Sequence, residues 1–268
     1  AFWAPPGNIW TGFHTTFEGE NRVFQKAELP VFLATEPQEN DSITVTIEDA
    51  NGQFVNTASG TGLKRGLNYL IWNLDEKPTY LPGSWVHEES RGIPVLPGVY
   101  TLKFQYRGQT SLSTVEIVAD PRFEIEKTVD LELYRYQKAV NDQVVKLSYL
   151  LGKTEAWNKA IKEKQDALEQ RRASNEKSKT VLKNLQSQLT ALNLLALDKP
   201  VDRQVGAWQS SRITAYSAVE QALKASSSRM TVPSVQDWKR VDLAEQLFKE
   251  FEKAVTQFER QEWVKFKK

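Results

Sequence analysis

The sequence predicts a chain that is β first and α second, with an antiparallel β-sandwich followed by a bundle of long antiparallel helices. Up to about residue 122, apolar residues alternate with polar ones in short runs that Gly, Pro and Asn turns separate. From residue 128 onward they recur at helical spacing over long stretches. The 268 residues are enough for two domains that each bury a core. We expect an irregular, aromatic-rich lead-in over 1–27, the sandwich over 28–122, and about four helices over 128–268.

The β half contains at least half a dozen candidate strands. Ile43–Glu48 alternates apolar and polar β-branched residues, and the turn Asp49–Gly52 follows it. In the strand that follows Gly66 we expect Leu67, Tyr69, Ile71 and Trp72 to be core residues, with Trp72 as a core anchor. The spacing is typical of an immunoglobulin-like sandwich. The predicted strands are 29–35, where Pro30 favours an edge or a strand start, 43–48, 53–57, 67–72, 99–106 and 112–118.

The helical half is predicted from apolar stripes and their breaks. Thr128 is a candidate N-cap, and the first helix could run to about Arg172, with Gly152 either breaking or merely softening it. Short connections between long amphipathic helices predict antiparallel neighbours. The other stripes are Val181, Leu185, Leu189, Leu192 and Leu195; then Val205, Trp208, Ile213, Tyr216, Val219 and Leu223 over 202–227; then Trp238, Val241, Leu247, Phe251, Val255 and Phe258.

Composition argues against several kinds of site. The chain has no cysteine and two histidines, so neither a thiolate nor a histidine-rich metal centre is expected. Residues 1–124 carry a net charge of −6 and residues 125–268 carry +7. This split could favour an acidic partner for the helical half. The basic residues alternate with acidic ones, however, so they do not indicate nucleic-acid binding. No apolar run approaches the roughly 18 residues of a spanning helix. The start at Ala1 lacks signal-peptide features, so we expect a removed signal or a piece of a longer chain.

Two segments are candidate contact surfaces. The aromatic lead-in is expected to pack on the sandwich or to contact a preceding domain. The insertion 76–94 is longer than an ordinary connection, and long loops on rigid scaffolds often carry function. The candidate contact residues are Tyr80, Trp85, His87, Trp3 and Trp10.

The sequence offers no catalytic constellation, and we expect no catalytic residue, cofactor or metal. His87-Glu88-Glu89 lacks the H-E-x-x-H spacing and is interpreted as a surface loop. A carboxylate-pair hydrolase remains an alternative, with candidate acids Asp75, Glu76, Glu88 and Glu89.

A family resemblance rests on ordered landmarks over roughly residues 29–170. The pattern resembles the C-terminal region of bacterial sortilin-type propeller proteins, which are often labelled BNR-repeat or glycosyl-hydrolase-like, and its sandwich resembles the module of the flagellar hook-capping protein. The usual Pro-Pro-x-Gly before the first strand is here only Glu36-Pro37-Gln38-Glu39, and no propeller repeat is present in the sequence. The landmarks are Asp49-Ala50-Asn51-Gly52, Gly66-Leu67-Asn68, Trp72-Asn73-Leu74, Leu96-Pro97-Gly98-Val99-Tyr100 and Asp120-Pro121-Arg122.

The resemblance implies a non-catalytic accessory region of an exported propeller protein, located in the periplasm, on the cell surface or outside the cell. Its partner would be another protein or the propeller itself, with no nucleic acid and no membrane-spanning segment. The alternative is a carbohydrate-binding module in which Tyr80 and Trp85 form a stacking platform. The family's glycosidase label would belong to the propeller and does not transfer to this chain.

Overall fold

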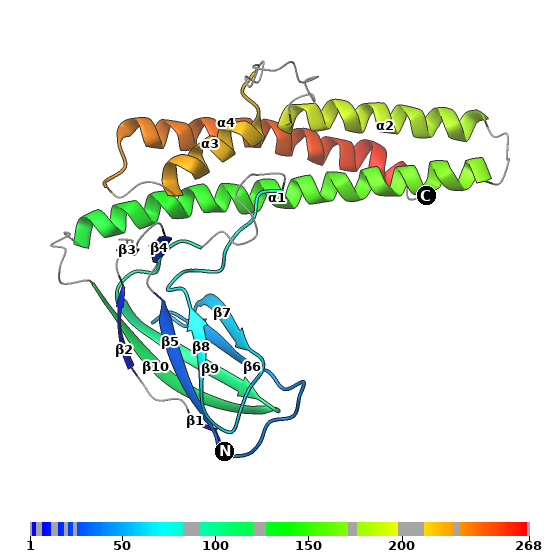
Figure 1. Ribbon diagram of the computed structural model, residues 1–268. Coiled ribbons are helices and arrows are strands. Elements are labelled where there is room, and N and C mark those ends of the chain that lie inside the picture. Colours follow the sequence, from blue (N-terminus) through cyan, green and yellow to red (C-terminus); the bar gives the residue numbers. More distant parts are fainter. Residues whose placement is uncertain are drawn as a thin grey trace. The chain divides into compact units, whose positions relative to one another are not determined.

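The chain consists of β-sheets followed by helices, as the sequence predicts (Figure 1). It divides into two compact units, which we call the β unit and the helical unit. The β unit comprises Ala1–Thr79, Glu89–Arg135 and Met230–Val232; the helical unit comprises Tyr80–Glu88, Tyr136–Arg229 and Pro233–Lys268. The computed structural model describes residues 2–3, 7–11, 16–18, 21–23, 26–82, 92–119, 127–170, 176–197, 212–227 and 231–266.

The described strands form two main sheets and one small hairpin. The pairing is antiparallel throughout, except that β2 runs parallel to β10. The three-stranded sheet has the order β1 (Phe2–Trp3), β5 (Ala27–Leu33), β8 (Gly66–Trp72). The five-stranded sheet has the order β2 (Gly7–Thr11), β10 (Gln109–Ala119), β9 (Gly98–Tyr106), β6 (Ile43–Glu48), β7 (Phe54–Gly60). The hairpin pairs β3 (Thr16–Glu18) with β4 (Asn21–Val23).

The lead-in differs from the irregular segment that the sequence predicts, because it contains the four strands β1 to β4. Strand β1 pairs with β5, and β2 pairs with β10, more than 100 residues further along the chain. The expected packing on the rest of the β unit therefore takes the form of main-chain pairing. Strands of two to five residues are too short to leave a local periodicity in the sequence, which is why the pattern missed them.

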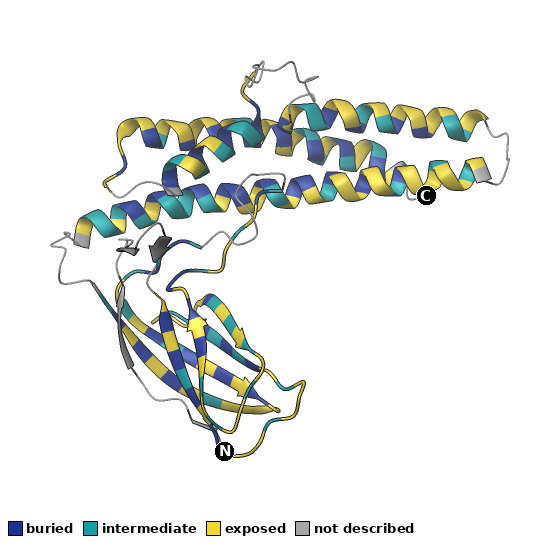
Figure 2. Cartoon of the chain, viewed as in Figure 1, coloured by how far each residue is buried: buried dark blue, intermediate teal, exposed yellow. Residues whose placement is uncertain are grey.

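The buried side chains of both main sheets belong to one hydrophobic cluster. Figure 2 shows the alternation of buried and exposed residues along the strands. Strand β6 has the predicted bounds, and its Ile43, Val45 and Ile47 are fully buried. Pro30 lies within β5 rather than at its start. Strand β1 pairs only with Phe32 and Leu33 of β5. Among the described residues, the main chain at Pro30 is therefore paired on one side only, with β8.

Strand β8 contradicts the predicted set of core residues. We expected Leu67, Tyr69 and Ile71 to face the core, but they are 46%, 55% and 42% exposed. The buried residues are instead Leu70 and Trp72, at 2% and 1% exposure, so the prediction for Trp72 is confirmed. Because large apolar residues lie on both faces of this strand, its alternation could not reveal which face points inward. The buried face of β8 is therefore the one that carries Leu70 and Trp72, not the one that carries Leu67, Tyr69 and Ile71.

The helices are long and continuous. Helix α1 passes Gly152 without a break, so the break left open by the sequence does not occur. This glycine is exposed, and an added Cβ would meet no neighbouring atom. Within α1, residues up to Arg135 belong to the β unit and residues from Tyr136 belong to the helical unit. The helices are α1 (Lys127–Gln170), α2 (Glu176–Ala196), α3 (Ala215–Ser227), α4 (Val235–Phe258), a π-helical turn (Glu259–Trp263) and α5 (Val264–Phe266).

Local capping decides where α3 and α4 begin. Helix α3 begins at Ala215 rather than near residue 202, because Thr214 and Ser217 exchange hydrogen bonds between side-chain oxygens and main-chain N–H groups. The predicted stripe residues Val205 and Trp208 lie outside the described residues. Helix α4 begins after Ser234, which forms a reciprocal capping box with Asp237.

Leucines and aromatic residues fill the core of the helical unit. On α2 the stripe Leu185, Leu189 and Leu192 is buried as predicted, whereas Val181 and Leu195 are 58% and 39% exposed. Trp157 of α1 packs against Phe258 and Trp263, each at a ring-centroid distance of 5.3 Å. Among the described helices, none is both long and apolar enough to cross a membrane.

Candidate functional site

The structure describes only some of the predicted contact residues. Tyr80 lies in the helical unit and is 45% exposed, and its carbonyl oxygen accepts a 2.6 Å hydrogen bond from Ser148 Oγ of α1. Trp85 and His87 lie outside the described residues, as do Glu88 and Glu89. The backbones of Trp3 and Trp10 lie in β1 and β2, in register with Phe32 and Val118.

Of the candidate acids, Asp75 lies at the centre of a polar cluster in the β unit. Its side chain is 3% exposed, and its two carboxylate oxygens accept hydrogen bonds from Asn56 Nδ2 at 3.0 Å and from the Gly92 main-chain N–H at 2.9 Å. Its carbonyl oxygen accepts bonds from Asn56 Nδ2 and Trp72 Nε1. The carboxylate of Asp75 therefore joins β7 to the end of the insertion, and its carbonyl oxygen joins both to β8.

The backbone around Asp75 is folded tightly. The preceding residue, Leu74, has a φ of 57°, in the left-handed region that non-glycine residues seldom adopt. A Cβ at Gly92 would lie 1.7 Å from the carbonyl oxygen of Glu76, so the chain can approach this closely only at a glycine. The Glu76 N–H donates to the Ile93 carbonyl oxygen, and the Val95 N–H donates to that of Leu74. These two hydrogen bonds hold the two ends of the insertion together.

Two tyrosines surround the next acid, Glu76. Tyr134, near the start of α1, donates a short hydrogen bond to the Glu76 carboxylate, and the pKa of Tyr134 is raised by burial and then by this bond. Tyr100 donates a 2.7 Å hydrogen bond to the carbonyl oxygen of Leu96. Burial, followed by the negative charges of Asp49 and Glu76, raises the pKa of Tyr100 to about 12. Both phenols are therefore neutral groups that fix local structure at ordinary pH.

The raised pKa of Tyr100 predicts a loss of stability in alkaline solution. Its neutral form is favoured in the folded state, so its contribution is complete below the unfolded value of 10.0 and is lost as the pH rises towards 12. Two pKa units correspond to roughly 3 kcal/mol at most. We expect the unfolding free energy of Tyr100→Phe to fall less steeply between these pH values than that of the native chain, as measured by chemical denaturation. Equal slopes for the two proteins would contradict this prediction.

A second polar group lies at the β9–β10 turn. The Arg107 guanidinium is 2.5 Å from an Asp41 carboxylate oxygen, which also accepts bonds from the Tyr106 hydroxyl and the Gln38 N–H. The hydrogen bond from Arg107, and then that from the Gln38 main chain, lower the pKa of Asp41. Arg107 has a φ of 46°, as expected in a two-residue hairpin loop that needs positive φ angles. This group holds the turn in place.

The described outer surface of the three-stranded sheet is mostly apolar, with the exposed Glu28 opposite Ile71 as its charged residue. In register, Phe32 lies opposite Leu67 and Pro30 lies opposite Tyr69, and cross-strand partners share one face of a sheet. Phe32 is 48% exposed, in the same range as the three misassigned residues of β8. The residues Pro30, Phe32, Leu67, Tyr69 and Ile71 form what we call the apolar face.

The outer surface of the five-stranded sheet is different. Its exposed apolar residues lie opposite charged residues: Val99 opposite Glu116, Leu112 opposite Lys103, and Phe54 opposite Glu48. Scattered apolar residues of this kind are ordinary on protein surfaces, whereas a contiguous patch is not. The apolar face is the surface that the sequence prediction missed. The sequence signal is that β8 carries large apolar residues on both faces, of which a single core can bury only one, although the strand itself does not tell which one.

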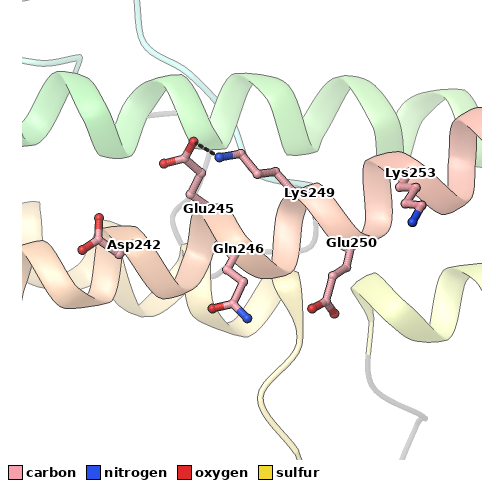
Figure 3. A pocket seen from close by; sticks show the side chains of 6 residues that line it. All are labelled: Asp242, Glu245, Gln246, Lys249, Glu250 and Lys253. Atoms are coloured by element: carbon pink, nitrogen blue, oxygen red, sulfur yellow. Dashed lines mark ion pairs between the residues drawn. The ribbon is translucent and has the colours of Figure 1, made fainter.

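An open depression of about 420 Å³ lies on the helical unit. Figure 3 shows that its six labelled side chains all come from α4, and that Glu245 and Lys249 form an ion pair, with a separation of 2.8 Å. All six residues are exposed and carry charged or amide groups of mixed sign. The spacing of three to four residues is that of a solvated helix face, so we assign no site here. The lining residues are Asp242, Glu245, Gln246, Lys249, Glu250 and Lys253.

Within the described residues, no group of three or more histidine, cysteine, aspartate or glutamate side chains is placed to hold a metal ion. Comparison with known proteins yields no matching family model and no significant match among curated proteins. Among the residues that the structure describes, the apolar face is the feature that most strongly indicates a function.

Proposed function

We propose that the β unit is an immunoglobulin-like sandwich and that the long helices form an antiparallel bundle. The strand orders β1-β5-β8 and β2-β10-β9-β6-β7, together with one core cluster common to both sheets, support the sandwich. The bond from Tyr100, near the start of β9, to the carbonyl four residues upstream is the arrangement of the tyrosine corner in such folds. Shared core clusters that draw on α1 to α4 support the bundle.

This chain acts, in our proposal, as a non-catalytic accessory region that makes protein–protein contacts through the apolar face. The observation that carries the proposal is the contrast between the two sheets. On the three-stranded sheet, two of the three exposed apolar residues of β8 lie opposite apolar residues, and the third, Ile71, lies opposite Glu28. On the five-stranded sheet, the three exposed apolar residues described above all lie opposite charges. Contiguous exposed apolar surface in a soluble domain marks an interaction site. The hydrogen-bonded burial of Asp75 supports a structural role for the more buried of the two described candidate acids.

The family resemblance supplies the setting of this proposal. The parent is an exported bacterial protein with a propeller, located in the periplasm, on the cell surface or outside the cell, and this chain braces it or recruits a protein partner. The ordered landmarks from Asp49 to Arg122 support this reading.

Site-specific photo-crosslinking in cells tests the proposed contact. A benzophenone amino acid at position 69 lies on the apolar face, and the same residue at position 112, where the native leucine is 67% exposed, lies on the opposite sheet as a matched control. We expect protein adducts, or an internal crosslink to another domain, from position 69 and none from position 112. Equal yields at both positions, or no adducts at position 69, would refute the contact.

Carbohydrate binding is the second candidate function. The 45% exposure of Tyr80, whose carbonyl oxygen is held by Ser148 of α1, favours it. Stacking of a sugar on this ring would give a glycan-array signal that Tyr80→Ala abolishes and Tyr69→Ala leaves intact. A signal that survives Tyr80→Ala, or no signal for the native chain, excludes this platform.

A further inference from the structure

The outward side of α1 has an apolar centre. The buried residues of this helix belong to the core of the helical unit, so the opposite side of the helix should be polar. Val145 and Tyr149 lie there instead, at 48% and 68% exposure, and the exposed residues Gly152 and Ala156 continue the same line. Their alternating spacing of four and three residues places all four on one face of the helix. We call Val145, Tyr149, Gly152 and Ala156 the α1 stripe.

Nothing in the described fold requires a glycine at the centre of this stripe. Glycine is less favourable than alanine inside a helix, and Gly152 has no positive φ that would call for it. A Cβ added at Gly152 would meet no atom within 4 Å. The space above this position is therefore open to a side chain from outside the chain.

Charged residues continue the line of the α1 stripe at both ends. Lys138 and Asp142 precede the stripe, and Lys159 and Glu163 follow it, with the same alternation of three and four residues. The signs therefore read positive then negative before the stripe, and positive then negative after it. A second α1 that lies antiparallel presents these signs in reverse order. Lys138 then faces Glu163, and Asp142 faces Lys159.

We propose that the α1 stripe binds the α1 stripe of a second copy of this chain, with the two helices antiparallel. In this arrangement Tyr149 lies opposite Gly152, so its ring fills the open space above the glycine, and Val145 lies opposite Ala156. Twofold symmetry repeats each of these pairings. Alternating spacings of three and four residues are those of helices that pack side by side along their length. The contact lies on the helical unit and is independent of the apolar face of the β unit.

The charges favour this partner and this register over the alternatives. A parallel copy in register would place every charge opposite its own like charge, which is unfavourable. An antiparallel copy shifted by seven residues would place Asp142 opposite Asp166 in one direction and opposite Gly152 in the other. Only the unshifted antiparallel copy gives each of the four flanking charges an opposite charge. This self-complementarity identifies a second copy of the chain as the occupant.

Sedimentation equilibrium of the 268-residue chain tests the proposal. We expect a reversible dimer that weakens at high salt, because its ion pairs lie at the surface. Asp142→Lys should weaken the dimer roughly tenfold, since two attractive pairs become repulsive, and the added Lys159→Asp should restore the affinity to within about threefold. Glu250→Lys, at an exposed acid of α4, is the matched control and should have little effect.

Disulfide formation tests the antiparallel register directly, because the chain contains no cysteine of its own. A mixture of Tyr149→Cys and Gly152→Cys chains should form disulfides between the two variants faster than either variant forms them with itself. Faster bonding of each variant with itself would refute the register.

The remaining outcomes also separate the possibilities. A chain that stays monomeric at every concentration refutes the proposal, as does a dimer that Asp142→Lys leaves unchanged or that Lys159→Asp does not restore. These results would leave the function proposed for the apolar face standing. A dimer that Tyr69→Lys abolishes and Asp142→Lys does not would place the second copy on the apolar face instead.

Discussion

Replacing Gly92 with alanine should lower the unfolding free energy of the β unit by at least about 3 kcal/mol. The added Cβ would lie 1.7 Å from the carbonyl oxygen and 2.7 Å from the carbonyl carbon of Glu76, and both are backbone atoms that cannot rotate away. Relief requires the two ends of the insertion to separate, which breaks the hydrogen bond from the Gly92 N–H to Asp75. Hydrogen exchange of the β6 and β9 amides measures the loss in this unit without interference from the helices.

Gly98→Ala is the matched control for this substitution. Gly98 has no atom within 4 Å of an added Cβ and no left-handed φ, so its replacement should change the unfolding free energy little. Equal exchange rates in the Gly92→Ala and Gly98→Ala variants would show that the insertion does not close on Glu76 as described.

The second large effect is expected for Asp75→Ala. Removing this buried carboxylate leaves the Gly92 N–H without its acceptor and removes one of the two acceptors of Asn56 Nδ2. Hydrogen bonds to a charged group contribute about 1.5–3 kcal/mol each, and an unsatisfied buried donor adds its own cost, so we expect a loss of about 3 kcal/mol. The exposed acid Glu116, on β10, is the control, and Glu116→Ala should change stability by less than about 0.5 kcal/mol.

The same hydrogen-exchange measurement checks the Asp75 prediction. A loss for Asp75→Ala no larger than that for Glu116→Ala would contradict the structural role of this carboxylate. It would then return Asp75 to the list of candidate catalytic acids.

Local sequence patterns correctly predicted the elements that neighbouring residues determine. The alternation of β6, the turn at Gly52, the core position of Trp72 and the long first helix are set by neighbouring residues, and the structure has them as expected. The start of α3 was predicted wrongly, because the Thr214–Ser217 capping pair marks the true boundary more clearly than the apolar spacing does.

Features set by distant partners could not be predicted in this way. Strands β1 and β2 exist through pairing with β5 and β10, and the closure of the insertion depends on Gly92 meeting Glu76. The inward face of β8 was misassigned because both of its faces are apolar, so only its partners determine which face is buried. The outward residues of β8 are as apolar as core residues. For this reason the sequence analysis placed them in the core, and for the same reason they form a candidate contact site on the surface.

The central claim is that Leu67, Tyr69 and Ile71 face solvent while Leu70 and Trp72 face the core. The chain contains no cysteine, so single cysteines introduced at these five positions of the 268-residue chain can each be labelled with a maleimide without background. We predict fast labelling at positions 67, 69 and 71 and slow labelling at positions 70 and 72. The opposite alternation, with 70 and 72 fast, would contradict the apolar face and the function proposed for it.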